Sequence, residues 1–174
     1  MFIIELILGI GILFFTFLAF FQINRTKFLL LNTFAILLIA ISFYLSNGYI
    51  GVYSEVAMLI VHLIALTTKE SYHKFLSVIV PPSSFVFFIY LQHHNLDYGI
   101  YDIFMPLAMT MFVFGVFQTD MAKNKLFFAV GLSFLLIYSF SIGALYVAFA
   151  NFIGLFITMI SFTNIETKNS KQET

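Results

Sequence analysis

Seven runs of apolar residues fill most of the chain, and each run is about as long as the hydrocarbon core of a bilayer is thick. A helix that crosses a core of about 30 Å, at about 1.5 Å per residue, needs about 20 residues. The segments between the runs are short, so we expect no soluble domain. The sequence therefore predicts an all-α integral membrane protein with seven transmembrane helices. The runs are 2–21, 28–46, 49–67, 75–92, 99–117, 125–142 and 145–162.

The composition agrees with this prediction and excludes several kinds of chemistry. Hydrophobic residues make up 61% of the chain and charged residues only 9%, which is far more apolar than a soluble domain needs. There is no cysteine, which excludes disulfides, thiol redox chemistry and thiolate metal sites. The first run begins at residue 2 without a basic segment before it. We therefore interpret it as a retained helix and not as a cleaved signal peptide.

The basic residues predict the orientation. With seven spans, they all fall in the first, third and fifth loops and the tail, on one side of the membrane. By the positive-inside rule that side is the cytoplasm, so the N-terminus is expected outside and the C-terminus inside. The fourth run contains Pro81 and Pro82, which weaken it as a helix, yet removing it would place the later basic residues outside. The basic residues are Arg25, Lys27, Lys69, Lys74, Lys123, Lys125, Lys168 and Lys171.

The first three and the last three runs share a common order. A shift of 96 residues places Phe21-Gln22 on Phe117-Gln118 and Lys27 on Lys123. Three helices are an odd number, so the second triplet has the same direction as the first only if one further span separates them. The sequence thus predicts two parallel three-helix bundles joined by a linker helix, a 3+1+3 arrangement. Its parts are the first repeat 2–67, the linker helix 75–92, the second repeat 99–162 and a cytoplasmic tail 163–174.

The segment from Phe21 to Gly51, FQINRTKFLLLNTFAILLIAISFYLSNGYIG, carries a Gln-x-x-Arg motif followed by a hydrophobic helix and a short turn with glycine. In these features it resembles the bacterial inner-membrane family of the YgjV type. The resemblance implies a multi-pass protein of the bacterial inner membrane. It implies no particular activity.

More distantly, the layout is similar to the PQ-loop group, which includes the SWEET and SemiSWEET sugar transporters. The run LYVAFANFIGLFITMIS is similar to the SWEET helix in which an asparagine faces the substrate. That resemblance implies a pocket at Asn151 and at Glu55, its equivalent in the first repeat. It also implies hinge or gating roles for Gln22 and Gln118. The prolines that precede these glutamines in the PQ-loop group are phenylalanines in this chain, so a proline-hinged motion and sugar specificity do not carry over.

The polar residues inside the apolar runs are the other candidates. An ionised Glu55 would cost at least about 2.5 kcal/mol in the membrane, so it must face protein or water, or stay protonated. It is either a substrate ligand or proton-coupling group, or a carboxyl that bonds a neighbouring helix. His62 lies two turns further on, and Thr158 lies equally far beyond Asn151. His62 either passes protons beside Glu55 or is satisfied by a neighbouring carbonyl or hydroxyl.

Gly9, Gly11 and Pro106 lie at matching depths of the two repeats. Helix interruptions at corresponding positions indicate a transport site, while the alternative for the glycines is close helix packing. His93 and Asp97, with the adjacent His94, form a polar cluster that we interpret as a solvated loop and not as a metal site.

Three function hypotheses follow. The first is a transporter of a small polar solute, with its site between the two repeats near Glu55 and Asn151. The second is a non-transporting receptor or scaffold with the same fold. The third, an intramembrane enzyme, is disfavoured because no paired acids, His-Glu-x-x-His, Gly-x-Ser-x-Gly or phosphate-loop motif lies on any span. We expect no cofactor, no metal and no nucleic-acid partner; the lipid bilayer is a partner, and a homo-oligomer is left open.

Overall fold

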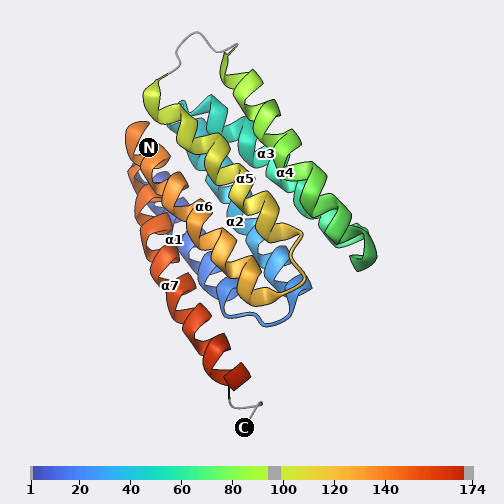
Figure 1. The fold of residues 1–174 in the computed structure, drawn as a ribbon. Coiled ribbons are helices and arrows are strands. Elements are labelled where there is room, and N and C mark those ends of the chain that lie inside the picture. Colours follow the sequence, from blue (N-terminus) through green and yellow to red (C-terminus); the bar gives the residue numbers. More distant parts are fainter. Residues whose placement is uncertain (1, 94–98, 171–174) are drawn as a thin grey trace.

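The computed structural model of the chain describes residues 2–93 and 99–170, and over these residues the fold is entirely helical (Figure 1). The prediction of an all-α protein with seven helices is confirmed for the described part of the chain. A short 3₁₀ helix, η1, precedes the fifth α-helix. The elements are α1 (Phe2–Phe20), α2 (Arg25–Leu45), α3 (Tyr49–Thr67), α4 (Glu70–His93), η1 (Ile100–Ile103), α5 (Phe104–Val116), α6 (Met121–Ser141) and α7 (Leu145–Ser170).

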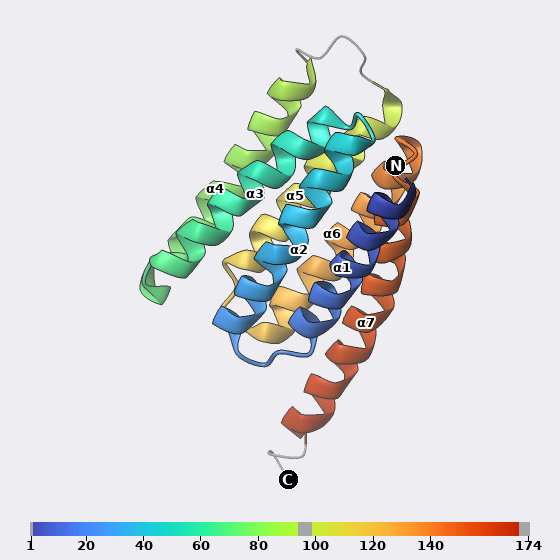
Figure 2. The same ribbon diagram turned by 180° about the vertical axis from the view of Figure 1, so that it is seen from behind.

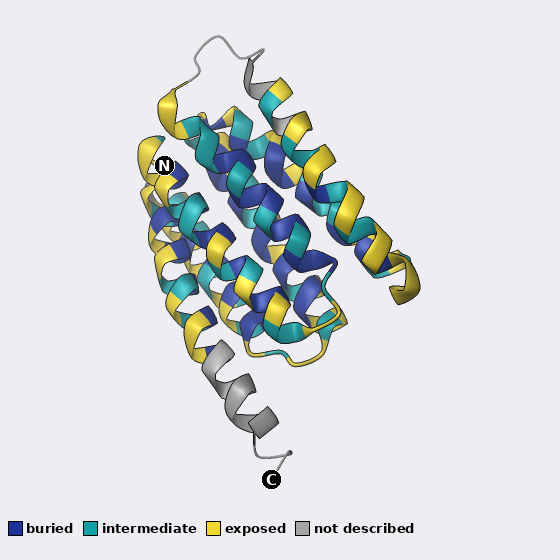
Figure 3. Ribbon diagram, viewed as in Figure 1, coloured by how far each residue is buried: buried dark blue, intermediate teal, exposed yellow. Residues whose placement is uncertain are grey.

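The outer surface of the bundle is apolar, as a protein surrounded by lipid requires. Large apolar side chains such as Ile7 and Val78 are more than half exposed, and exposed positions follow the outside of the bundle (Figure 3). Four of the described helices are long and apolar enough to cross a membrane: α1 over Ile3–Phe20, α2, α3 and α6. Shorter apolar helices cover Ile100–Val116 and Leu145–Ser161.

Six helices form a closed ring, and α4 lies outside it (Figures 1 and 2). Around the ring, α1 packs on α2, α2 on α3, α3 on α5, α5 on α6, α6 on α7, and α7 again on α1. In this order α3 and α7 occupy opposite positions. The α4 helix packs mainly on α5, and this explains why α5 carries no exposed large apolar side chain while α1 carries many.

The helix boundaries recur after 96 residues. The α2 helix begins at Arg25 and ends at Leu45, and α6 begins at Met121 and ends at Ser141, each 96 positions later. Both helices start at a capping side chain at equivalent positions: Asn24 Oδ1 accepts from the Lys27 amide, and Asp120 Oδ1 accepts from the Ala122 amide.

The turns that follow α2 and α6 are also equivalent. Asn47 and Gly143, 96 positions apart, both have a left-handed backbone, with φ of 58° and 73°. After each of them the next amide donates back into the helix, from Gly48 to Phe43 O at 2.8 Å and from Ala144 to Ser139 O at 2.9 Å. Asparagine and glycine are the residues that adopt this conformation at least cost, so both turns are encoded locally.

Several predicted boundaries need correction. The α2, α4 and α6 helices begin at Arg25, Glu70 and Met121, before the starts at 28, 75 and 125 that hydropathy predicted. The span expected from residue 99 begins as η1, and α5 itself begins only at Phe104. The last helix continues to Ser170, so the segment predicted as a tail is helical over most of its length. The α4 helix, by contrast, runs without a break through Pro81 and Pro82, as the seven-helix prediction required.

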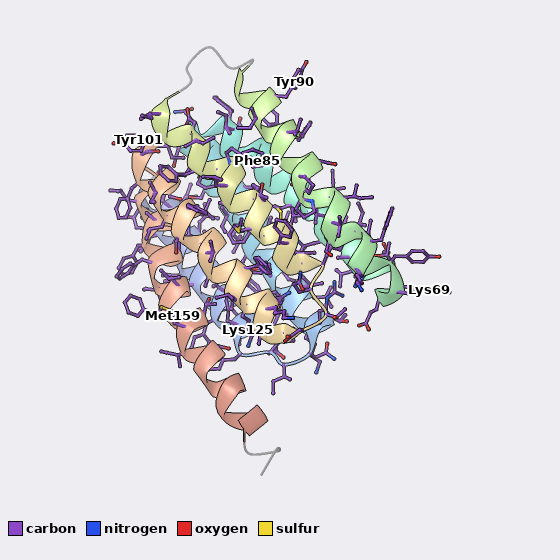
Figure 4. All side chains as sticks on the ribbon, viewed as in Figure 1. Lys69, Phe85, Tyr90, Tyr101, Lys125 and Met159 are labelled. Carbon is purple, nitrogen blue, oxygen red and sulfur yellow. The ribbon has the colours of Figure 1, made fainter. Side chains whose placement is uncertain are left out.

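The two lysines and the two tyrosines labelled in Figure 4 lie at opposite ends of the bundle. Lys69 and Lys125 lie toward the end where α1 meets α2, and Tyr90 and Tyr101 lie toward the other end (Figure 4). The side of the membrane that each end faces stays a prediction.

Candidate functional site

A small cavity of about 30 Å³ lies inside the ring of helices. A volume of this size has room for about one or two water molecules. Its walls are mostly aliphatic and aromatic, with a few polar side chains pointing inward. The lining residues are Thr16, Phe20, Asn32, Ala35, Ile36, Ile39, Glu55, Met58, Phe112, Phe128, Leu132, Leu135 and Asn151.

The lining has a symmetry that follows the recurring helix boundaries. Most lining residues form pairs of positions separated by 96 residues, so equivalent parts of the first and the last three helices face the same space. The pairs are Thr16 with Phe112, Asn32 with Phe128, Ile36 with Leu132, Ile39 with Leu135, and Glu55 with Asn151.

Glu55 and Asn151 come from α3 and α7, on opposite sides of the ring, and each is only 2% exposed. One carboxyl oxygen of Glu55, Oε1, has no hydrogen-bond partner among the described residues. Asn151 Nδ2 donates to Ser139 Oγ at 3.4 Å, and that hydroxyl donates to Leu135 O at 2.7 Å. The two side chains predicted as a pair therefore line one cavity, and one of them offers an unused acceptor to it.

His62 is fully buried behind the cavity wall and is satisfied by neighbours. Its Nδ1 lies 2.9 Å from Met58 O, which only accepts, so Nδ1 carries the proton and donates. The other ring nitrogen of the neutral ring then accepts from Asn32 Nδ2 at 3.3 Å. His62 thus orients Asn32, which does line the cavity. Thr158, its equivalent on α7, is buried and donates to Gly154 O of its own helix.

Aromatic side chains close the end of the cavity toward the basic residues. The Phe128 ring lies 5.0 Å from that of Phe28, 5.2 Å from that of Phe112 and 6.1 Å from that of Phe20, measured between centroids. These contacts join α6 to α1, α2 and α5 around one central ring. His62 adds an edge contact at 6.5 Å from α3.

A second aromatic contact lies toward the other end. Phe43 on α2 and Tyr138 on α6 are both buried and meet edge to face at 5.7 Å. They lie one turn beyond the lining residues Ile39 and Leu135. The cavity is therefore enclosed between two aromatic layers.

Two basic side chains bind the ends of helices across the ring. Lys125 on α6 is buried, and its Nζ donates to Phe20 O, in the last residue of α1, and to Ser161 Oγ, both at 2.6 Å. Arg25 on α2 donates from Nη2 to Val116 O, in the last residue of α5, at 2.6 Å. Phe20 and Val116 are equivalent positions, 96 residues apart, so these clamps are reciprocal. Each satisfies carbonyls that a helix end leaves free.

The candidate gating glutamines lie beside these clamps and outside the cavity lining. Gln22 Nε2 donates to Leu18 O at 3.1 Å, and Gln118 O accepts from Arg25 Nε at 3.2 Å. Both residues follow the last turn of an equivalent helix, α1 or α5.

The expected helix interruptions are wrong for α1, which runs unbroken through Gly9 and Gly11. Both glycines serve packing: a Cβ at Gly9 would lie 3.3 Å from Tyr146 Cβ, and one at Gly11 would lie 2.8 Å from Leu38 Cδ1. Pro106 lies in the first turn of α5, where backbone N–H groups have no acceptor within the helix. The missing N–H of proline therefore costs no helical hydrogen bond, and Pro106 does not interrupt α5.

Thr16 is a lining residue that the sequence interpretation missed, and Asn32, a polar residue of the second apolar run, lines the cavity as well. The shift of 96 residues aligns Thr16 with Phe112 and Asn32 with Phe128. Applied to the polar residues of the first and second runs, it would have singled out these two positions. The outer cluster of His93, His94 and Asp97 lies outside the residues whose side chains are described. Over the described residues, no group of acidic or histidine side chains could hold a metal ion.

A ring of apolar helices around a small internal cavity with a few polar side chains is the architecture of an all-helical integral membrane protein. Within that class, the chain belongs to the Imp-YgjV family of bacterial inner membrane proteins, whose model matches residues 2–170. The prediction from the Phe21–Gly51 segment is thereby confirmed, as is the location in the bacterial inner membrane. No curated protein and no solved structure matches the chain.

Proposed function

We propose that this protein is a transporter of a small polar solute, which passes through the central cavity between two three-helix repeats. The single observation that carries the proposal is the lining of that cavity by equivalent residues of both repeats, with Glu55 Oε1 left unpaired. A buried polar group without a partner is costly, so its retention suggests a ligand.

The proposed architecture is the 3+1+3 arrangement, with repeats 2–67 and 99–162 related by an axis along the membrane normal. Support comes from helix boundaries that recur after 96 residues and from the contacts of α3 with α5 and of α7 with α1, which are equivalent junctions. The outer place of α4 suits a linker that restores the chain direction.

The proposed motion is a rocking of one repeat against the other. Opening toward one side would separate Phe128 from Phe20 and Phe28 and release the Lys125 and Arg25 clamps. Opening toward the other side would separate Phe43 from Tyr138. The enclosed cavity of about 30 Å³ then corresponds to a closed state that must widen to admit solute.

A thermal-shift screen of small polar solutes on the purified protein tests this function. We expect at least one solute to raise the melting temperature of the parent. Glu55→Gln and Asn151→Ala should lose that response, and Glu5→Gln, which changes an acidic residue outside the lining, should keep it. Solutes that stabilise all variants equally would contradict the central site.

A non-transporting receptor or scaffold is the second candidate, and the small size of the cavity favours it. Under this hypothesis the helices would stay packed, and a cysteine at Ile36 in the cavity wall would remain unreactive from both sides. Reaction of this cysteine with a small polar thiol reagent favours transport.

The proposed topology is tested by cysteine labelling, which has no background because the chain has no cysteine. A cysteine at Asn47 should be labelled by an impermeant reagent in intact cells, and one at Ser71 should react only after lysis. The opposite result would invert the proposed orientation.

A further inference from the structure

We infer that the solute is a small protonated amine, which exchanges with a proton at Glu55. This inference rests on the proposed function and names the chemistry of its site. It starts from the charge of the cavity. Among the lining residues Glu55 is the one ionisable side chain, it is 2% exposed, and its Oε1 is unpaired.

No cation of the described protein neutralises Glu55. Lys125, which is buried, and Arg25, which is half-buried, are engaged with helix-end carbonyls near the ends of α1 and α5. His62, two turns away on the same helix, uses both ring nitrogens, one as donor and one as acceptor. An ionised carboxylate inside a membrane protein needs a positive partner, so without one Glu55 holds a proton.

The other groups around Glu55 do not offer a second charge. From α6, Tyr138 is the titratable group that interacts electrostatically with it. The α5 segment Phe104–Val116 has no ionisable residue, and α2 and α7 contribute the amides of Asn32 and Asn151 to the lining. One carboxyl group therefore sets the charge of the whole cavity.

The remaining walls suit an ammonium group with a short apolar part. The amide and hydroxyl oxygens of Asn151, Asn32 and Thr16 accept hydrogen bonds, and phenylalanine faces attract cations. A carboxylate or phosphate would meet no positive group in the lining, which makes an anionic solute a poor fit.

A single carboxyl group cannot hold a proton and pair with an ammonium ion at the same time. Binding then transfers the carboxyl proton to water on the open side, and the ammonium ion takes its place beside the carboxylate. Release on the other side reverses the step, since a proton from water reprotonates Glu55 as the amine leaves. No electron is transferred and no covalent bond other than O–H changes.

The test uses purified full-length protein in detergent, with methylammonium, ethylammonium and guanidinium chloride as probes and sodium chloride as the ionic control. Titration calorimetry in two buffers of different ionisation enthalpy measures how many protons are released per cation bound. We expect about one proton per cation, and an affinity that rises about tenfold per pH unit while Glu55 is protonated in the free protein. Glu55→Gln should abolish both effects, and Glu55→Asp should retain proton release.

Asn151→Ala serves as the matched variant in the same cavity, because it removes an amide and leaves the carboxyl group. It should weaken cation binding without changing the number of protons released. Cation binding that is independent of pH, or that survives in Glu55→Gln, would overturn the exchange. If a neutral or anionic solute binds instead, the amine inference fails while the transport proposal stands. If no solute of any charge binds, both fail.

Discussion

The hydrogen bond between Asn32 on α2 and His62 on α3 gives the sharpest energetic prediction, because each partner can be removed alone or together. His62→Leu leaves the Asn32 amide without its acceptor, and Asn32→Leu leaves a histidine nitrogen without its donor. An unpaired buried polar group costs about 1–3 kcal/mol. Loss of the His62 ring also removes its bond to Met58 O, but that carbonyl still accepts from a backbone amide of α3. The expected cost therefore comes from the Asn32–His62 bond alone.

The double variant should be more stable than the sum of the single effects predicts. Interhelical hydrogen bonds in membrane proteins average about 0.6 kcal/mol, with a maximum of about 1.7. The Asn32–His62 distance of 3.3 Å exceeds the common value of about 3.0 Å, which favours the lower half of that range. We therefore expect a coupling energy of about 0.6–1 kcal/mol.

Unfolding in mixed micelles with increasing dodecyl sulfate, followed by far-ultraviolet circular dichroism, measures this cycle. The chain has no tryptophan, so helix content is the practical signal. Thr158→Val is the matched control, because it removes a hydroxyl at the equivalent position whose bond stays within α7. A coupling energy within about 0.3 kcal/mol of zero would refute the reasoning, since independent sites add to that accuracy.

Two further predictions concern the closed state and its packing. Lys125→Met should raise the reactivity of a cysteine at Ile36 from the cytoplasmic side about fivefold, if the clamp contributes about 1 kcal/mol to closure. Lys27→Met, at an exposed position of the same end, should leave that labelling rate unchanged. Gly51→Ala should cost about 1–3 kcal/mol in the unfolding assay, because its Cβ would lie 2.5 Å from Cδ2 of Phe43. Phe43→Leu in the same chain should recover part of that loss, and a fully stable Gly51→Ala protein would contradict the packing described.

The helices were predictable because the apolar runs and their caps act locally. Asn24, Asp120, Asn47 and Gly143 mark the limits of α2 and α6 in the structure. Hydropathy alone placed the starts of these helices later, at residues 28 and 125. The late start of α5 was not predictable from hydropathy, since the stretch Ile100–Val116 is apolar as a whole despite Asp102. Only the preference of Pro106 for a first helical turn indicated it.

The candidate site was predictable where a polar residue interrupts an apolar run, as Glu55 and Asn151 do. The contacts of a charged residue were not predictable where its position in the sequence fits two different roles. Lys125 counted only toward orientation, because a lysine at a helix end can reach water or turn into the bundle, and sequence alone does not separate these cases. Its burial against Phe20 and Ser161 depends on the packing of α6 against α1 and α7.

The reciprocal clamps have a consequence for how this protein can vary. The acceptors at positions 20 and 116 are main-chain carbonyls, so every residue type there presents them. Apart from the bond of Lys125 to Ser161 Oγ, each clamp can therefore be lost only by mutation of its basic partner, and replacement of Phe20 or Val116 leaves its chemistry intact. Random mutagenesis should find clamp-deficient variants clustered at Lys125 and Arg25, with no suppressors among the acceptor side chains.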